Sequence, residues 1–132
     1  MKITSSHDVF RFAQVFTISR GSRSQVEVLS VTIEKNGFIG RGECVPYARY
    51  DETLSSVEDE ISNLPQEIDR QRLPDFLPAG AARNAVDCAL WDLEAKTSGK
   101  RVWQLAGLNE PKPEITAYTL SLNTPKKMHA QA

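Results

Sequence analysis

The sequence predicts an α+β fold in which an antiparallel meander sheet comes first and a helical bundle follows. Three observations support this class. β-Branched runs fill the first third of the chain, an Asn-Gly pair separates two of them, and apolar residues at helical spacing follow. Strands and helices are thus segregated along the chain, which is typical of α+β rather than alternating α/β domains.

The expected strands are Val9–Thr17, Val26–Ile33 and Phe38–Cys44. Asn36-Gly37 lies between the last two, and both residues tolerate the positive φ of a tight hairpin turn. The polar, basic segment 19–24 and the segment 45–52 are expected to be exposed loops.

Two long helices are expected after the sheet, over Thr53–Leu64 and Ala79–Thr97. Thr53 is a suitable N-cap, and the second helix carries one apolar stripe. The stripe consists of Ala82, Val86, Ala89, Leu90 and Leu93. Residues 73–78 are interpreted as a Pro-punctuated connection, and 102–105 as one short helical turn.

The last residues predict a strand, Glu114–Leu122, followed by a helix with a start signal but no stop signal. Thr124 suits the N-cap and Pro125 the first helical position. One βα unit cannot form a sheet. We therefore expect a domain over 1–110 and the truncated start of a second domain over 111–132. An unpaired strand also predicts marginal solubility or self-association.

The composition excludes several classes of function. The 132 residues carry a formal net charge of -1, which gives no electrostatic basis for binding nucleic acid or an anionic membrane. No apolar run approaches the length of a membrane span. The N-terminus lacks an apolar signal core, so a cytoplasmic location with reduced Cys44 and Cys88 is expected. Cys88 is interpreted as a buried helix residue.

Motifs of phosphate-loop, dinucleotide-binding and serine-hydrolase sites are absent, and no Cys or His residues have metal-ligand spacing. Asp87 and Asp92 lie five apart on the second long helix, do not share a face, and are interpreted as structural. Two predicted loops are more suggestive. One carries Arg20 and Arg23, whose guanidinium groups match carboxylates in bidentate geometry. The other carries an aromatic and basic cluster, 47–50. By spacing alone, ordinary surface charges and packed tyrosines remain open as the alternative.

Several segments together resemble a known family. They are Arg-Gly-Ser-Arg at 20–23, Gly-Arg-Gly-Glu-Cys-Val-Pro-Tyr-Ala-Arg-Tyr at 40–50, the helix 78–94, Leu-Ala-Gly at 105–107 and Tyr-Thr-Leu-Ser at 118–121. The chain resembles the N-terminal capping domain of the enolase superfamily, of the mandelate racemase/muconate lactonizing enzyme type. Within that type it is most similar to the dipeptide (L-Ala-D/L-Glu) epimerases.

The resemblance implies an isomerase whose cap packs over a (β/α)7β barrel, with residues 114–122 as the first barrel strand. It implies two catalytic lysines and the acidic ligands of Mg²⁺ on barrel strands. No catalytic or metal-binding residue is therefore expected in this chain, which alone should be inactive. The substrate would be a dipeptide, the role recycling of cell-wall (murein) peptide, and a homo-oligomer is possible.

The resemblance also implies a set of substrate-binding residues. Arg23, with Arg20 as the alternate, matches the position expected to meet a substrate carboxylate. Tyr47 and Tyr50 would wall the pocket, and Thr119 would contact substrate near the end of the first barrel strand.

Two alternatives stay open. One is the cap of another muconate-lactonizing-type enzyme, an o-succinylbenzoate synthase or a cycloisomerase, because the cap shape is shared. The other is a free-standing interaction module without a catalytic partner.

Overall fold

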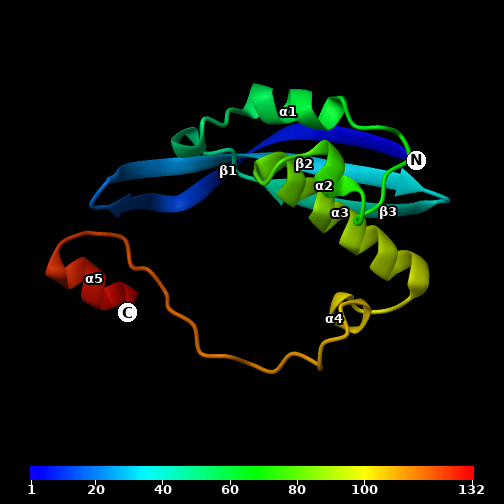
Figure 1. The fold of residues 1–132 in the computed structure, drawn as a ribbon. Helices are drawn as coiled ribbons and strands as arrows, with labels where there is room; N and C mark the ends of the chain where they lie inside the picture. The colour runs from blue at the N-terminus through cyan, green and yellow to red at the C-terminus, as the bar shows by residue number, and fades with distance from the viewer. The chain divides into compact units, whose positions relative to one another are not determined.

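The computed structural model describes all 132 residues and begins with a three-stranded antiparallel meander (Figure 1). The strands are β1 (Lys2–Ile18), β2 (Gly21–Lys35) and β3 (Phe38–Cys44), in the order β1-β2-β3. The predicted meander is confirmed. The first two strands are longer than predicted, because β1 begins at Lys2 and β2 at Gly21.

The β2–β3 hairpin turns at Asn36 and Gly37, whose φ angles are 52° and 80°. Its register pairs Lys35 with Phe38 beside the turn and Leu29 with Cys44 at the far end. Positive φ at both central residues is the geometry that the Asn-Gly pair predicts.

The helices follow the sheet, as predicted. They are η1 (Ala48–Tyr50), α1 (Leu54–Ser62), α2 (Leu73–Phe76), α3 (Ala81–Ser98), α4 (Val102–Leu105) and α5 (Pro125–Gln131). Thr53 caps α1 in a capping box: its hydroxyl accepts from the Ser56 amide at 3.1 Å, while Ser56 Oγ accepts from the Thr53 amide at 3.0 Å. The segment 73–78 is not only a connection, since α2 forms within it.

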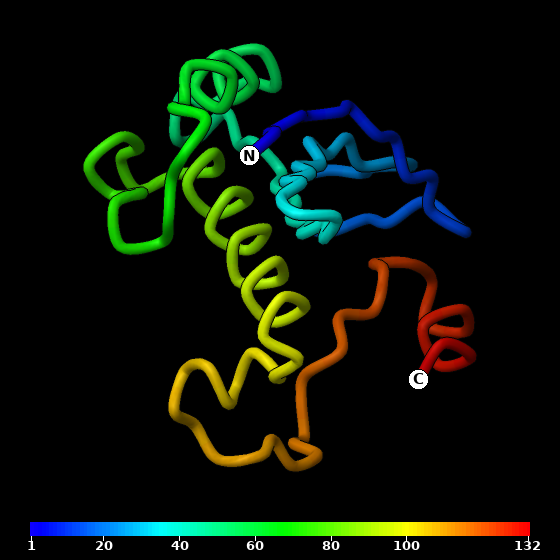
Figure 2. The backbone as a smooth tube through the Cα atoms, turned by 90° about the vertical axis from the view of Figure 1, so that its right-hand side faces the viewer, coloured from blue at the N-terminus to red at the C-terminus, as the bar shows by residue number.

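The hydrophobic core lies between the sheet and helices α1 to α3, which share one side of the strands (Figure 2). The predicted apolar stripe of α3 is buried in full, and β2 contributes the fully buried Leu29 and Ile33. Val57 and Ile61 of α1 complete the layer. Burial of this continuous apolar surface is the main source of the stability of the fold.

Helix α3 packs so closely on β3 that two positions of the strand have no room for a side chain. A Cβ atom on Gly40 would lie 2.1 Å from the Ala89 carbonyl oxygen, and one on Gly42 would lie 2.1 Å from that of Ala85. Glycine inside a strand marks such a close approach of another backbone. The Gly-x-Gly element of the sequence is therefore a packing motif in this structure.

The outer edge of β3 is covered by two charged side chains of α3. The Arg41 amide donates to Asp92 Oδ2 at 2.8 Å, and Lys96 Nζ donates to the Ile39 carbonyl oxygen at 2.8 Å. Lys96 and Asp92 also pair with each other at 2.6 Å. An edge strand with unpaired backbone groups invites pairing with another chain, and these two contacts occupy such groups.

The chain divides into two compact units. The core unit comprises residues 1–8 and 27–110, and the hairpin unit comprises residues 9–26 and 111–132. The hairpin unit thus joins the far end of β1 and β2 to the C-terminal segment. The sequence-based division into 1–110 and 111–132 did not anticipate this grouping and stays a prediction.

The predicted strand over 114–122 is not formed. Residues 108–124 have no regular secondary structure, and Ile115 and Tyr118 are exposed at 103% and 84%. A strand requires a neighbour for its backbone groups, and this segment contacts β1 only at its end, where the Leu122 amide donates to the Thr17 carbonyl oxygen at 2.8 Å. The helix expected after Thr124 does form, as α5.

Candidate functional site

The two arginines of the Arg-Gly-Ser-Arg motif lie at the end of the β1–β2 hairpin. The predicted loop 19–24 is only a two-residue turn, Ser19-Arg20, so Arg23 lies on strand β2 rather than in a loop. The reason is Gly21, whose φ of 145° lets the chain enter β2 immediately after the turn. Both arginines are exposed, and neither has an acidic partner among the ion pairs of the chain.

Thr119 belongs to the same hairpin unit but lies exposed in the irregular segment before α5. Two residues later, Ser121 is 5% exposed and is the one buried polar residue of the chain. Its hydroxyl bonds to two backbone groups of β1. Sequence reasoning missed Ser121 as a candidate, because a serine in a strand-like run gives no local signal of a contact more than a hundred residues away.

The two candidate tyrosines lie together in the core unit. Tyr47 precedes η1 and Tyr50 ends it, and their ring centroids are 5.9 Å apart at an interplanar angle of 54°. Both rings are exposed, Tyr47 at 39% and Tyr50 at 69%. Such a tilted pair presents a rigid aromatic surface that loses little conformational entropy when a ligand packs on it.

Glu52 holds this aromatic segment against the start of α3. One carboxylate oxygen accepts from the Tyr47 amide at 3.1 Å and the other from the Ala81 amide at 2.7 Å. Gly80, the residue before α3, has no capping side chain, so the carboxylate of Glu52 occupies the N-terminus of the helix instead. A Cβ on Gly80 would lie only 3.0 Å from Glu52 Oε1. Sequence analysis did not single out Glu52.

A pocket of about 520 Å³ opens beside this segment. Its lining residues are Cys44, Val45, Tyr47, Tyr50, Glu52, Ala79, Gly80, Ala81 and Asn84. Burial, with the nearby charges of Glu52 and Glu43, raises the pKa of the Cys44 thiol to about 11. Cys44 is therefore a protonated packing residue and not a nucleophile.

The interpretation of Cys88 as a buried residue is wrong, because its side chain on α3 is exposed. It lies one position before the buried Ala89, on the flank of the apolar stripe. Partial desolvation and the charge of Asp87 raise the pKa of the Cys88 thiol.

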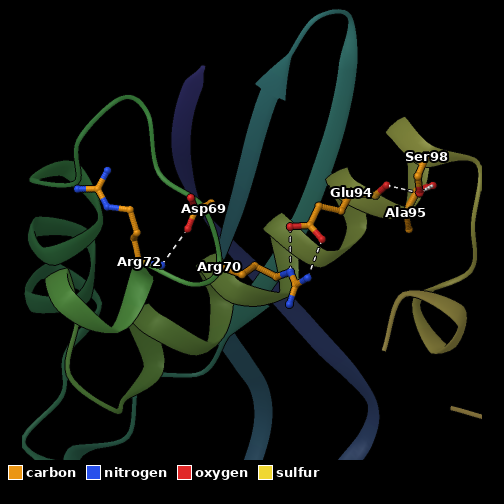
Figure 3. Close-up of polar contacts among 6 residues, drawn as sticks. All are labelled: Asp69, Arg70, Arg72, Glu94, Ala95 and Ser98. Carbon is orange, nitrogen blue, oxygen red and sulfur yellow. Dashed lines mark hydrogen bonds and ion pairs between the residues drawn. The ribbon is translucent and has the colours of Figure 1, made fainter. Parts of the chain in front are cut away.

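Polar contacts between the segment before α2 and helix α3, and within each of them, involve other charged residues (Figure 3). Arg70 donates to both carboxylate oxygens of Glu94, at 3.0 and 2.7 Å, and its guanidinium lies 3.4 Å from the centroid of the Trp91 ring. The hydrogen bond to Glu94 raises the pKa of Arg70. Asp69 Oδ1 accepts from the Arg72 amide at 2.8 Å. The charges of Arg70 and Glu94 are paired with each other, and Asp69 is bonded to backbone, so we interpret these contacts as structural.

Asp92 is structural, as predicted, because it bonds to the edge of β3 and to Lys96. No group of three or more His, Cys, Asp or Glu side chains could hold a metal ion, so the residues of this chain do not fit a Mg²⁺ site. No helix combines the length and the apolar character needed to cross a membrane.

The structure therefore brings the predicted residues together in two groups. Arg20, Arg23 and Thr119 belong to the hairpin unit, and Tyr47 and Tyr50 belong to the core unit. Each group is solvent-accessible in its own unit.

The fold, a meander sheet covered on one side by helices, defines a capping domain of the enolase type. Residues 2–107 match the family described as mandelate racemase / muconate lactonizing enzyme, N-terminal domain, and the chain belongs to this family.

Two curated proteins and one solved structure show which members of the family this chain is similar to. The L-Ala-D/L-Glu epimerase of Escherichia coli (strain K12) is 44% identical over 117 residues, which are 86% of this chain and 36% of that protein. The N-acetyl-D-glutamate racemase of a Pseudoalteromonas species is 42% identical over 107 residues, or 76% of this chain and 34% of that protein.

The third is a crystal structure of an enolase family member from Agrobacterium tumefaciens with homology to dipeptide epimerases. It superposes with a TM-score of 0.84 and 45% identity, over 98% of this chain and 41% of that chain. That structure holds sodium and L-Ala-L-Glu with an ordered loop.

The chain thus spans little more than a third of the length of the curated relatives it matches, and it corresponds to their N-terminal part. These matches confirm the resemblance to dipeptide epimerases. They do not favour the o-succinylbenzoate synthase, cycloisomerase or free-standing-module alternatives.

Proposed function

We propose that the chain is the substrate-recognising cap of an epimerase that acts on N-acylated glutamate, with L-Ala-D/L-Glu as the leading substrate. The observation that carries this proposal is the pair of exposed arginines without acidic partners, Arg20 and Arg23, at the end of the β1–β2 hairpin. The substrates named for the three relatives share one chemistry. Each contains a glutamate whose amino group is acylated, by alanine or by acetate.

An N-acylglutamate carries two carboxylates, and they have different tasks in an epimerisation. The α-carboxylate acidifies the neighbouring C–H bond, which must lose its proton on one face and regain it on the other. The side-chain carboxylate takes no part in bond breaking and is available for recognition. A guanidinium fork matches a carboxylate in bidentate geometry, so Arg23, with Arg20 as the alternate, would bind the side-chain carboxylate.

Tyr47 and Tyr50 of the core unit, and Thr119 of the hairpin unit, are further substrate-binding residues in this proposal. Tyr47 and Tyr50 would pack on the acyl part of the substrate, and Glu52 would keep them in place through its bonds to the Tyr47 and Ala81 amides. Thr119 would contribute a hydroxyl from the hairpin unit. In this role the cap binds, orients and excludes water.

The proton-transferring lysines and the metal ligands would come from a barrel domain on which the cap packs, because the residues of this chain do not form a metal site. A bound Mg²⁺ would supply positive charge for the enolate that forms at the α-carboxylate. We place the reaction in the cytoplasm, in cell-wall peptide recycling; the two unpaired cysteines fit a reducing compartment.

A chimera tests the proposal. Residues 1–132 would replace the matching N-terminal part of the Escherichia coli epimerase. The exchange of the α-carbon proton with solvent would then measure epimerisation of L-Ala-L-Glu, L-Ala-L-Gln and N-acetyl-D-glutamate. We expect activity with L-Ala-L-Glu. Arg23→Ala should lower kcat/KM for this substrate by about 100-fold, the cost of losing a charged hydrogen-bonding partner.

The neutral substrate makes the test specific for charge. L-Ala-L-Gln lacks the side-chain carboxylate, so Arg23→Ala should change its kcat/KM less than twofold. Arg11→Ala, an exposed arginine of β1 outside the motif, is the matched control and should leave both substrates unaffected. Equal losses with both substrates, or no loss with L-Ala-L-Glu, would remove Arg23 from the site. Preference for N-acetyl-D-glutamate would favour a racemase of that compound instead.

A further inference from the structure

Ser121 is buried within a segment whose other residues, apart from the half-buried Leu120, are exposed. Its exposed fraction is 5%, whereas Ile115 and Tyr118 of the same segment are exposed at 103% and 84%, and Leu122 at 55%. A buried hydroxyl costs free energy unless it is hydrogen-bonded, so its partners indicate what this contact does.

The hydroxyl of Ser121 is both a donor and an acceptor of hydrogen bonds with strand β1. It accepts a hydrogen bond from the Thr17 amide at 2.9 Å and donates one to the Val15 carbonyl oxygen at 3.2 Å. The next residue adds a third bond, from the Leu122 amide to the Thr17 carbonyl oxygen at 2.8 Å. Both backbone groups of Thr17 are therefore bonded to residues 121 and 122.

The contact continues across the hairpin to the residues beside the arginines. Thr17 Oγ1 and Ser22 Oγ are 2.8 Å apart and share a hydrogen bond. Ser22 lies between Arg20 and Arg23 in the sequence, one residue before Arg23. A chain of hydrogen bonds thus runs from Ser121 through Thr17 to Ser22, between Arg20 of the turn and Arg23 of β2.

Apolar packing holds this hairpin end only in part, with Phe16 and Leu120 half-buried. Val9, Phe10 and Val15 of β1 are exposed at 48%, 53% and 56%, and Ile18 is exposed at 38%. With so little apolar surface buried, the directional bonds at Thr17 decide where the hairpin end lies relative to residues 119–122.

We propose that Ser121 is a positioning residue that fixes the hairpin end carrying Arg20 and Arg23 to the segment carrying Thr119. It holds two parts of the proposed substrate-binding set in one arrangement and touches no substrate itself. The consequence for catalysis rests on the proposed function, whereas the contact itself does not.

Hydrogen exchange of the full chain, read by NMR, tests the contact without any substrate. Ser121→Ala leaves the Thr17 amide without its acceptor, so this amide should exchange about tenfold faster. Ser121→Thr keeps the hydroxyl and should restore most of the protection. Ser62→Ala is the matched control, because Ser62 Oγ makes one exposed bond, to the Asp59 carbonyl oxygen, in the core unit. It should leave the Thr17 amide unchanged.

Unchanged exchange of Thr17 in Ser121→Ala would overturn the proposal. Equal acceleration of the amides of α3 would also overturn it, because the serine would then act on the whole fold rather than on the hairpin. If Ser121→Ala does not fold, Leu122→Pro removes the neighbouring amide donor, keeps the Ser121 hydroxyl and tests the same contact. It should raise exchange in the hairpin unit and leave α3 protected.

The chimera provides a second measurement, the KM for each substrate, which distinguishes a positioning role of Ser121 from a purely structural one. Ser121→Ala should raise KM for L-Ala-L-Glu about tenfold and change kcat less than twofold, because binding is lost equally before and at the transition state. KM for L-Ala-L-Gln should stay constant. An inactive parent chimera would count against the proposed function, while the exchange result would still decide the contact.

Discussion

The contacts inside the core unit differ in kind from the contacts inside the hairpin unit. In the core unit, α3 lies in close contact with β3 and buries a continuous apolar layer against the sheet. In the hairpin unit, most large apolar side chains stay exposed, and hydrogen bonds centred on Thr17 and Ser121 join its two segments.

The difference suggests separate tasks: the core unit provides the stability of the fold, and the hairpin unit carries the residues proposed to recognise the substrate. Hydrophobic burial scales with area and is tolerant of detail, so the core unit carries the free energy of folding. Hydrogen bonds are directional but contribute only about 1 kcal/mol each. In the hairpin unit they therefore fix the relative positions of the two segments more than they add to the free energy of folding. The proposed carboxylate-binding arginines belong to the unit in which position matters more than strength.

Two glycine-to-alanine substitutions should show the contrast most strongly. In Gly42→Ala the new methyl group would collide with the Ala85 carbonyl oxygen at 2.1 Å, which forces α3 away from β3. Overpacking of this kind costs about 3 kcal/mol, so the free energy of unfolding, measured by urea denaturation, should fall by that amount.

Gly21→Ala is the matched variant in the hairpin unit. No atom lies within 4 Å of the added methyl group, and the cost comes only from a φ of 145°. Strain of this kind costs about 1 to 3 kcal/mol, and the hairpin end can relax to avoid it. The main transition in urea should therefore stay close to that of the parent chain. A larger loss in Gly21→Ala than in Gly42→Ala would contradict the division of roles.

Glu52 offers an intermediate effect at the border between packing and recognition. Glu52→Ala leaves the Tyr47 and Ala81 amides without their acceptor and removes the negative charge from the start of α3. Loss of a helix cap costs about 1 kcal/mol, and the second bond adds a similar amount, so we expect a loss of about 2 kcal/mol. Thermal denaturation followed by circular dichroism measures it.

Glu52→Gln serves as the control, because its amide oxygen keeps one of the two bonds. It should lose about half as much free energy of unfolding. A loss in Glu52→Gln equal to that in Glu52→Ala would show that the charge, and not the pair of bonds, stabilises this segment.

The sequence predicted the elements whose signals are local. The Asn36-Gly37 turn, the Thr53 cap and the apolar stripe of α3 each depend on residues within a few positions of one another. The hairpin end was predicted as a loop, because Ser22 and Arg23 lack strand propensity, although pairing with β1 makes them part of β2.

The contacts that the sequence could not predict all span long separations. Glu52 bonds to Ala81, and Ser121 bonds to Thr17, and in neither case does a periodic pattern point to the partner. Gly42 belongs to a sequence motif, but only the structure shows the backbone of α3 packed against it. The arginines were found because an unusual motif marks them, and their contact with substrate stays a prediction.

The smallest expected effect concerns the edge of β3 and depends on pH. Burial alone would raise the pKa of Asp92, but hydrogen bonds from Lys96 and the Arg41 amide, with their charges, outweigh it and lower the pKa below its ordinary value of 3.8. A carboxylate with a lowered pKa in the folded state stabilises the fold above its ordinary pKa, and this contribution is lost as the pH falls through the folded-state value.

Asp92→Asn keeps an acceptor for Arg41 but removes the ion pair with Lys96. Because the pair is partly exposed, the variant should lose no more than about 1 kcal/mol at pH 7. The difference from the parent chain should begin to shrink as the pH falls below 3.8 and should be lost below the lowered pKa of the folded state, where the parent carboxylate is also neutral. A gap that stays constant from pH 7 to pH 2 would mean that Asp92 stabilises the edge of β3 through shape and hydrogen bonding rather than through charge.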